Sequence, residues 1–301
     1  MYRTAHARYS RTDAQTHAQT GWLDNAGSFD ALAPYFVARG FTFLALDPPG
    51  CGHSDHRASH ESYNDFDEVP LIADVLDYVG WKAPIVLVAH SRGGAVGATF
   101  AGAFPDRVKA AVFFDSSLGL TGLYPSQEYT TAPERLQQAR ESDLSNQQRT
   151  VRIFTDVNSA VRHSLENPFF PKALHTARAI VERHLTPCDG GYMFRHDVRT
   201  YGQKQNLHID EAQMREFLAA LACPVLRVNA TARIVELPEA YEARVQARLA
   251  VIKDLTNIDV EGKHHVHSDE PAACAAVVFE WLDQRLYSGT AVRLGGTPSR
   301  L

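Results

Sequence analysis

The stretch that decides the fold is Ile85-Val86-Leu87-Val88-Ala89-His90-Ser91-Arg92-Gly93-Gly94. Its apolar, β-branched first half predicts a short buried strand, and the small residues that follow predict a sharp turn into a helix. This is the setting of the G-x-S-x-G motif, in which small neighbours two residues away let one serine stand above the sheet edge. Here the serine is Ser91, and its small neighbours are Ala89 and Gly93. We expect Ser91 to be a nucleophile; the alternative is an ordinary strand-to-helix turn with a capping serine.

Strands and helices alternate on both sides of this turn. With 301 residues, of which 45% are hydrophobic, the chain is long enough for one large domain with an insertion. The alternation predicts an α/β fold with a mostly parallel sheet that helices cover on both faces. Further strands are expected at 41–46, 109–114, 224–229 and 255–260, and helices at 66–80, 92–104 and 238–251.

The composition excludes several classes of protein. The net charge is −5 and no basic run is interleaved with aromatics, so nucleic acid is not an expected partner. No apolar segment approaches the roughly 18 residues that span a bilayer. The four cysteines are far apart without C-x-x-C spacing, which indicates reduced thiols in an intracellular protein rather than a zinc site. An apolar leader is absent from residues 1–20, so no signal peptide is expected.

The last three residues resemble a targeting signal. Ser299, Arg300 and Leu301 are similar to the S-K-L peroxisomal signal, with arginine in place of lysine. In a eukaryotic host we expect a peroxisomal or related location, with the peroxisomal import receptor as a partner. In any other host a cytoplasmic location is expected.

Four segments together carry a resemblance to a known family. They are the segment Gly21-Trp22-Leu23-Asp24-Asn25-Ala26-Gly27-Ser28-Phe29-Asp30, the loop 47–54, the turn at Ser91 and the stretch after Asp259. They resemble the α/β-hydrolase superfamily and, more narrowly, the serine hydrolase-like proteins, of which the first segment is typical. The resemblance covers residues 21 to about 287.

The resemblance implies a division of the chain. An α/β-hydrolase core is expected at 21–117 and 216–287, as a doubly wound, mostly parallel sheet. A helical cap that shapes the substrate pocket is expected at 118–215. An atypical polar segment at 1–20 and a flexible tail at 288–301 remain outside the core.

A serine hydroxyl becomes a nucleophile when an imidazole takes its proton and a carboxylate orients that imidazole. In this fold the three residues follow in the order serine, acid, histidine. Similarity to G-H-x-x-x-x-E-x-P endings of the superfamily implies that His264 is the base. His265 is the alternative, and His267 is expected to be a structural or surface residue. A metal site on these histidines is less favoured because the local carboxylates lack the usual ligand spacing, so no metal or cofactor is expected.

The acid is expected at an unusual place. Most superfamily members carry it after the strand corresponding to 224–229, but Arg233 stands at about that position here. Some branches carry it after the preceding strand, where Asp115 stands. Asp115 is therefore the expected acid, with Glu236 and Glu239 in reserve; a turn or cap role for Asp115 is the alternative.

An oxyanion hole needs two backbone N–H groups. One is expected from Arg92, directly after the nucleophile, and the resemblance implies the other from Trp22. The family's histidine before Gly21 is Thr20 in this chain. That histidine orders the loop, so its replacement weakens the expectation of the second donor.

The N-terminal segment departs most from the family. Members have a hydrophobic strand directly before Gly21, in the middle of the sheet, whereas residues 1–20 are polar. An absent central strand would leave backbone groups unpaired, at about 1–3 kcal/mol for each group. Either residues 13–20 fill the gap as a poorly matched strand, or the chain is a truncated or misread version of a longer one. We expect the second, with the N-terminal strands missing.

These observations favour a serine hydrolase that cleaves an ester, thioester or amide bond of a small acyl substrate through an acyl-enzyme. A serine at this turn argues against dehalogenase or epoxide hydrolase chemistry, which needs a carboxylate nucleophile. The competing hypothesis is a hydrolase-like binding protein or an incomplete chain. Thr20, Ala89 and the expected gap in the sheet favour that second hypothesis.

Overall fold

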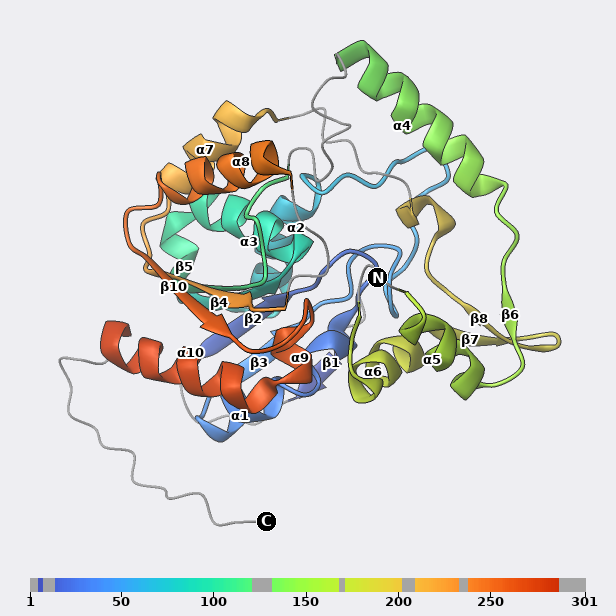
Figure 1. Ribbon diagram of the computed structural model, residues 1–301, viewed down its shortest axis with the longest axis horizontal. Helices are drawn as coiled ribbons and strands as arrows, with labels where there is room; N and C mark the ends of the chain where they lie inside the picture. Colours follow the sequence, from blue (N-terminus) through green and yellow to red (C-terminus); the bar gives the residue numbers. More distant parts are fainter. Residues whose placement is uncertain are drawn as a thin grey trace.

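The computed structural model describes residues 5–7, 14–120, 132–167, 171–201, 209–232 and 238–286. It has a twisted central sheet between two groups of helices, with a smaller unit of helices and short strands beside it (Figure 1). Within these residues, no helix is both long and apolar enough to cross a membrane. The predictions for Arg233, Glu236, Ser299, Arg300 and Leu301 fall outside the described residues.

The central sheet confirms the expected fold class. Its strand order over the described residues is β1-β3-β2-β4-β5-β9-β10, and every neighbouring pair is parallel except β1 with β3. The strands are β1 (Ala5–Ala7), β2 (Gln15–Gln19), β3 (Thr42–Ala45), β4 (Ile85–His90), β5 (Val108–Phe114), β9 (Val225–Ala230) and β10 (Leu255–Val260).

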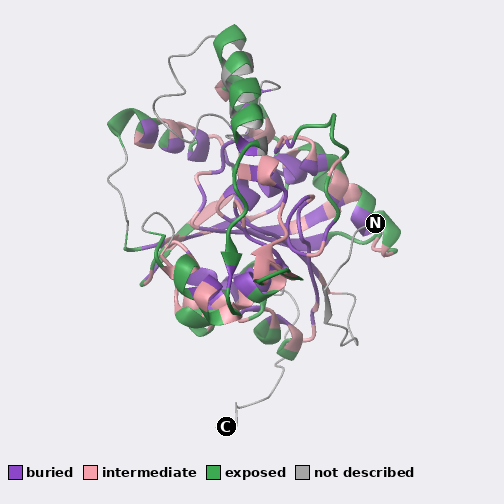
Figure 2. Cartoon of the chain, turned by 90° about the vertical axis from the view of Figure 1, so that its right-hand side faces the viewer, coloured by how far each residue is buried: buried purple, intermediate pink, exposed green. Residues whose placement is uncertain are grey.

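Both faces of the sheet are buried, which explains the unbroken apolar run of β4. Ile85, Leu87 and Ala89 belong to one apolar cluster, and Val86 and Val88 belong to the other. Buried residues accordingly concentrate along the central strands (Figure 2). The first cluster includes α2 (Glu68–Tyr78), α3 (Arg92–Ala103), α7 (Glu211–Ala219) and α8 (Glu239–Leu249), and the second includes η1 (Ala26–Phe29), α1 (Ala33–Ala38), α9 (Val266–Asp269) and α10 (Pro271–Leu286).

The expectation that the central strand before Gly21 is missing is wrong. Gln15–Gln19 forms β2, which pairs in parallel with β3 on one side and with β4 on the other. In this register His17 lies opposite Leu44 on β3 and Leu87 on β4. The backbone groups of β2 thus pair with both neighbours, because ladder hydrogen bonds do not depend on whether the side chains are apolar.

One polar side chain of β2, that of Gln19, bonds to the first residue of α2. Gln19 Nε2 donates to Glu68 Oε2 at 3.1 Å, and Arg92 donates to Glu68 at 3.0 Å and to Asp65 at 2.6 Å. These four side chains belong to residues that are at most 7% exposed. On the opposite face of the strand, Ala18 joins the apolar cluster. The polar side chain of Gln19 therefore fits this buried position, because it meets a buried ion-pair network.

His17 makes stability depend on pH. Burial lowers the pKa of this fully buried side chain to about 4, against a smaller opposing effect of the nearby Gln19 side chain. Between pH 6.5 and 4 the unfolded chain therefore binds a proton at His17 that the folded chain does not bind. The contribution of this residue to stability falls as the pH falls through that window, and it is constant above it.

We expect His17→Val to remove this dependence while leaving a β-branched residue suited to a strand. The free energy of unfolding of the variant, minus that of the natural chain, should increase by about 3 kcal/mol as the pH falls from about 7 to about 4. Urea unfolding followed by circular dichroism at several pH values measures this difference. Parallel stability curves for the two proteins would contradict the assignment.

The insertion between β5 and α7 contains helices, as expected, and also a small sheet that the sequence did not predict. Its three strands are antiparallel in the order β6-β8-β7. They are only two to four residues long, and Gly190 allows the tight turn between β7 and β8 with a φ of +87°. The elements are α4 (Ala132–Gln147), β6 (Ile153–Phe154), α5 (Val157–Leu165), α6 (Leu174–His184), β7 (Leu185–Cys188), β8 (Gly191–Phe194) and η4 (Val198–Tyr201).

Hydrogen bonds connect helix α6 of this insertion to the loop after β2. Asn25 Nδ2 donates to the carbonyl of Ile180 at 2.8 Å, and His184 Nε2 donates to the carbonyl of Leu23 at 3.0 Å. Arg183 also pairs with the buried Asp47 at 2.7 Å. The insertion therefore rests on the carboxyl-terminal edge of the sheet, where the candidate site residues lie.

Candidate functional site

Ser91 occupies a strained turn between β4 and α3. Its φ of 52° and ψ of −123° are rare for a residue with a side chain and cost on the order of 1–3 kcal/mol. The turn is held by backbone hydrogen bonds, from Ser91 N to the carbonyl of Phe114 and from Gly94 N to the carbonyl of Ser91, both 2.9 Å long. Ser116 Oγ also donates to the Ser91 carbonyl at 2.7 Å. The surrounding strands thus maintain a conformation that the serine would not adopt alone.

Packing requires that Gly93, one of the two small neighbours of Ser91, has no side chain. A Cβ atom on Gly93 would lie 2.4 Å from the carbonyl oxygens of both Gln19 and Thr20. Ala89 does not require a glycine across from it, since a Cβ on Gly97 would lie 3.5 Å from that of Ala89, an ordinary contact. The end of β2 therefore lies directly against the start of α3.

This packing distinguishes two glycines on the same helix. Gly93→Ala should lower the free energy of unfolding by about 2–3 kcal/mol, because two backbone oxygens cannot move away. Gly97→Ala should change it by less than about 1 kcal/mol, because the better helix propensity of alanine offsets a 3.2 Å approach to Leu87. Denaturant unfolding of both variants measures the difference, and equal destabilisation would contradict the close contact with β2.

The structure brings Ser91, His264 and Asp115 into one hydrogen-bonded chain. His264 Nδ1 lies 2.6 Å from Asp115 Oδ2, and His264 Nε2 lies 2.9 Å from Ser91 Oγ. Because the carboxylate accepts, Nδ1 carries the hydrogen, and Nε2 is left to accept from the serine hydroxyl. The imidazole side chain is 18% exposed and the carboxylate 26%, so both remain open to a small molecule.

Asp115 is held by the neighbouring strand. Its backbone N–H donates to the carbonyl of Val228 at 2.8 Å, and its Oδ1 accepts from the N–H of Ala230 at 3.2 Å. Burial raises the pKa of this carboxyl, but the hydrogen bond and charge of His264 lower it further, so its pKa lies below the usual value. Asp115 is therefore an ionised partner of His264 at neutral pH.

The alternative residues lie elsewhere. His265 points to Asp24 rather than to Ser91, and His267 is fully buried between His90 and Phe114. Glu239, a reserve acid, is exposed at the first position of α8.

The loop after β2 is anchored on several sides. Trp22 Nε1 donates to the carbonyl of Thr200 in the insertion at 3.1 Å. Leu23 has a φ of 57°, and Asp24 N donates to the carbonyl of Gly21 at 3.3 Å, which closes the turn. Arg92 supplies the first backbone N–H of α3, one of the groups that have no acceptor within the helix. Trp22 and Arg92 thus stand on the two segments that flank Ser91 in the fold.

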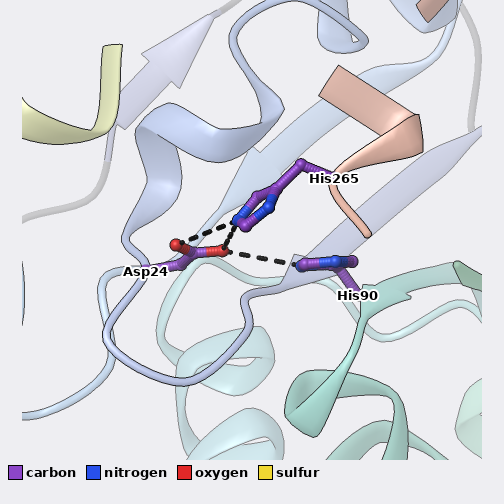
Figure 3. A group of neighbouring side chains, drawn as sticks. All are labelled: Asp24, His90 and His265. Atoms are coloured by element: carbon purple, nitrogen blue, oxygen red, sulfur yellow. Dashed lines mark hydrogen bonds and ion pairs between the residues drawn. The ribbon is translucent and has the colours of Figure 1, made fainter. Parts of the chain in front are cut away.

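Asp24, His90 and His265 form a buried group behind Ser91 that the sequence did not predict (Figure 3). Asp24 Oδ2 lies 3.2 Å from His265 Nε2 and 3.5 Å from His90 Nδ1. Burial raises the pKa of Asp24, but His265 and His90 lower it more, so its pKa lies well below the usual value. In the described part of the chain, this is the group of histidines, cysteines and acids with donor atoms close enough to hold a metal ion, all within 4.8 Å of one another.

Comparison with known proteins gives the family. The family model of the alpha/beta hydrolase fold matches residues 19–174, which is more than half of the chain. This chain belongs to that family. Its serine hydrolase-like relatives include one from Danio rerio, 27% identical over 284 residues, which are 93% of this chain and 85% of the relative. Another from Mus musculus is 26% identical and covers 91% of this chain and 89% of its own length. These relatives confirm the predicted resemblance.

Solved structures agree with this fold. A hypothetical protein from Pseudomonas aeruginosa superposes with a TM-score of 0.77 at 29% identity, over 92% of this chain and 94% of that one. The thioesterase domain from the curacin biosynthetic pathway has a TM-score of 0.75 at 19% identity, over 93% of this chain and 99% of that one. At that identity the second comparison concerns the fold alone.

Proposed function

We propose that this alpha/beta hydrolase is a serine hydrolase that cleaves an ester, thioester or amide bond of a small acyl substrate through an acyl-enzyme on Ser91. The observation that carries the proposal is the chain of two hydrogen bonds, 2.9 Å and 2.6 Å long, from Ser91 through His264 to Asp115. The names of the relatives, among them a probable serine hydrolase from Drosophila melanogaster, are consistent with this chemistry.

In the first half of the reaction, Ser91 Oγ attacks the carbonyl carbon of the substrate and its proton passes to His264 Nε2. The imidazolium that forms keeps its Nδ1–H on Asp115, whose ionised carboxylate stabilises the positive charge. The carbonyl oxygen becomes an oxyanion, for which the backbone N–H groups of Arg92 and Trp22 are the proposed donors. His264 then gives its proton to the leaving oxygen, sulfur or nitrogen, and the acyl group remains on Ser91.

In the second half a water molecule replaces the leaving group. His264 Nε2 takes a proton from this water while the water oxygen attacks the acyl carbon. The Ser91–acyl bond breaks, the proton returns to Ser91 Oγ and the carboxylic acid leaves. Each half uses the same imidazole, which alternates between base and acid.

Labelling with a fluorophosphonate tests the nucleophile without a known substrate. We expect intact-mass analysis to find one adduct on the natural chain and none on Ser91→Ala, because the reagent reacts only with an activated serine. Circular dichroism of both proteins shows whether they are folded. A folded natural chain that forms no adduct would contradict the proposal and favour the binding-protein hypothesis.

The position of the acid is tested by matched amide substitutions. Asp115→Asn should slow labelling of Ser91 by about 10³–10⁴-fold, because an amide stabilises the wrong tautomer of His264 and cannot balance the imidazolium charge. Glu239→Gln, at an exposed site, should label at the natural rate. Glu236→Gln serves as the second control. The reverse ranking of Asp115 and either glutamate would show that the acid lies after β9.

A further inference from the structure

Two hydrogen-bond acceptors face each other in the buried group behind Ser91. His90 Nε2 lies 2.8 Å from the carbonyl oxygen of His264, and since a carbonyl can only accept, Nε2 carries the hydrogen. Nδ1 of the same ring makes no hydrogen bond although the carboxylate of Asp24 lies beside it, as expected of a ring nitrogen that carries no hydrogen. Its Nδ1 therefore presents a lone pair, and this lone pair points toward the carboxylate of Asp24 (Figure 3).

The space between these two atoms fits a cation better than a water molecule. His90 Nδ1 has no hydrogen-bond partner, and it lies 3.5 Å from Asp24 Oδ2. A bridging water needs about 2.8 Å to each partner, which a gap of this size does not give in a favourable geometry. Two ligand atoms held at about 2.1 Å from a tetrahedral zinc ion lie about 3.4 Å apart. The separations of 3.5 Å and 3.2 Å around Asp24 Oδ2 are close to that value, and the third pair, His90 Nδ1 and His265 Nε2, lies within 4.8 Å.

The surroundings resemble the outer shell of a metal centre. Histidine ligands usually donate their second ring N–H to a carbonyl or carboxylate, and His90 does so to the carbonyl of His264. Asp24, His90 and His265 are at most 5% exposed, so an ion held by them would be largely removed from solvent. Lys172, which also interacts with Asp24, brings a positive charge near the group, and Asp269 offsets it.

We propose that Asp24, His90 and His265 form a binding site for a divalent transition-metal ion of the zinc class. The ion takes Asp24 Oδ2, His90 Nδ1 and His265 Nε2 as ligands. His265 Nε2 now donates to Asp24, so on binding its hydrogen moves to Nδ1 of the same ring, which has no partner in the structure. The ring stays neutral and no oxidant or reductant takes part.

Such an ion would join three segments that come together only in the folded chain. Asp24 belongs to the loop after β2, His90 directly precedes Ser91, and His265 directly follows His264. The site is separate from the hydrogen-bonded chain through Ser91, since none of its three members contributes to that chain. The proposal therefore stands or falls independently of hydrolysis.

Zinc titration of the chelator-treated full chain tests the site. Isothermal titration calorimetry with Zn²⁺ should find one ion for each natural chain. His265→Gln and Asp24→Asn should each bind it at least about 10-fold more weakly, because each removes one ligand. Asp24→Asn preserves the shape of the side chain that it replaces, and the amide that it introduces can donate to His90. His175→Gln, at an exposed histidine outside the group, is the matched control and should bind as the natural chain does.

Three results would overturn the proposal. They are the absence of stoichiometric Zn²⁺ binding by the natural chain, equal affinity of His265→Gln, Asp24→Asn and the natural chain, or a loss of affinity in His175→Gln that matches theirs. X-ray absorption of the zinc-loaded natural chain needs no variant and covers the case in which a substitution prevents folding. It should show nitrogen and oxygen ligands with two imidazoles, and a shell containing sulfur would equally contradict the site.

Discussion

The close contact between the end of β2 and the start of α3 is the constraint on which the candidate site depends. Two carbonyl oxygens, of Gln19 and Thr20, occupy the space where a side chain on Gly93 would lie. This contact fixes the beginning of α3 beside the loop 20–25, and Ser91 is the residue that must take the strained φ between strand and helix. The same contact brings the turn of Ser91 next to the loop that carries Trp22 and Asp24. A chain without β2 would lose the support of the turn as well as the centre of the sheet.

The network of Gln19, Glu68, Arg92 and Asp65 makes that contact stable in spite of its polarity. Burial raises the cost of each charge, and the cost is offset only where the charges are paired and hydrogen-bonded. Arg92 meets this condition by bonding both carboxylates, and Glu68 meets it by also accepting from Gln19. Because Arg92 is also the first residue of α3, the network holds the backbone N–H beside Ser91 in place. Its contribution is the position of the helix start rather than a large gain in stability.

The sequence predicted the regular part of the fold because hydrophobic periodicity and turn residues are local signals. Strands β3, β4, β5, β9 and β10 and helices α2, α3 and α8 lie close to the expected ranges. The contact of His264 with Ser91 and Asp115 was also expected, since the order of these residues in such folds is known and each follows a recognisable strand.

The strand β2 was misjudged because its hydrophobicity was weighed without Glu68, which lies 49 residues away from Gln19. Asp24 and His265 are 241 residues apart, so no local sequence pattern indicates that they pair. Strands β6, β7 and β8 were missed because two to four residues are too few to show a period.

The position of the carboxylate that bonds His264 follows from the sheet itself. Strands β5 and β9 are parallel neighbours, with Phe114 opposite Val228, so their carboxyl ends lie side by side, about 4.8 Å apart. A carboxylate at the carboxyl end of either strand can therefore reach the imidazole of His264, which lies in the loop after β10. Asp115 stands at the end of β5, and β9 still contributes, since the N–H of Ala230 donates to Asp115 Oδ1 at 3.2 Å. The backbone of β9 thus orients a carboxylate that the neighbouring strand carries.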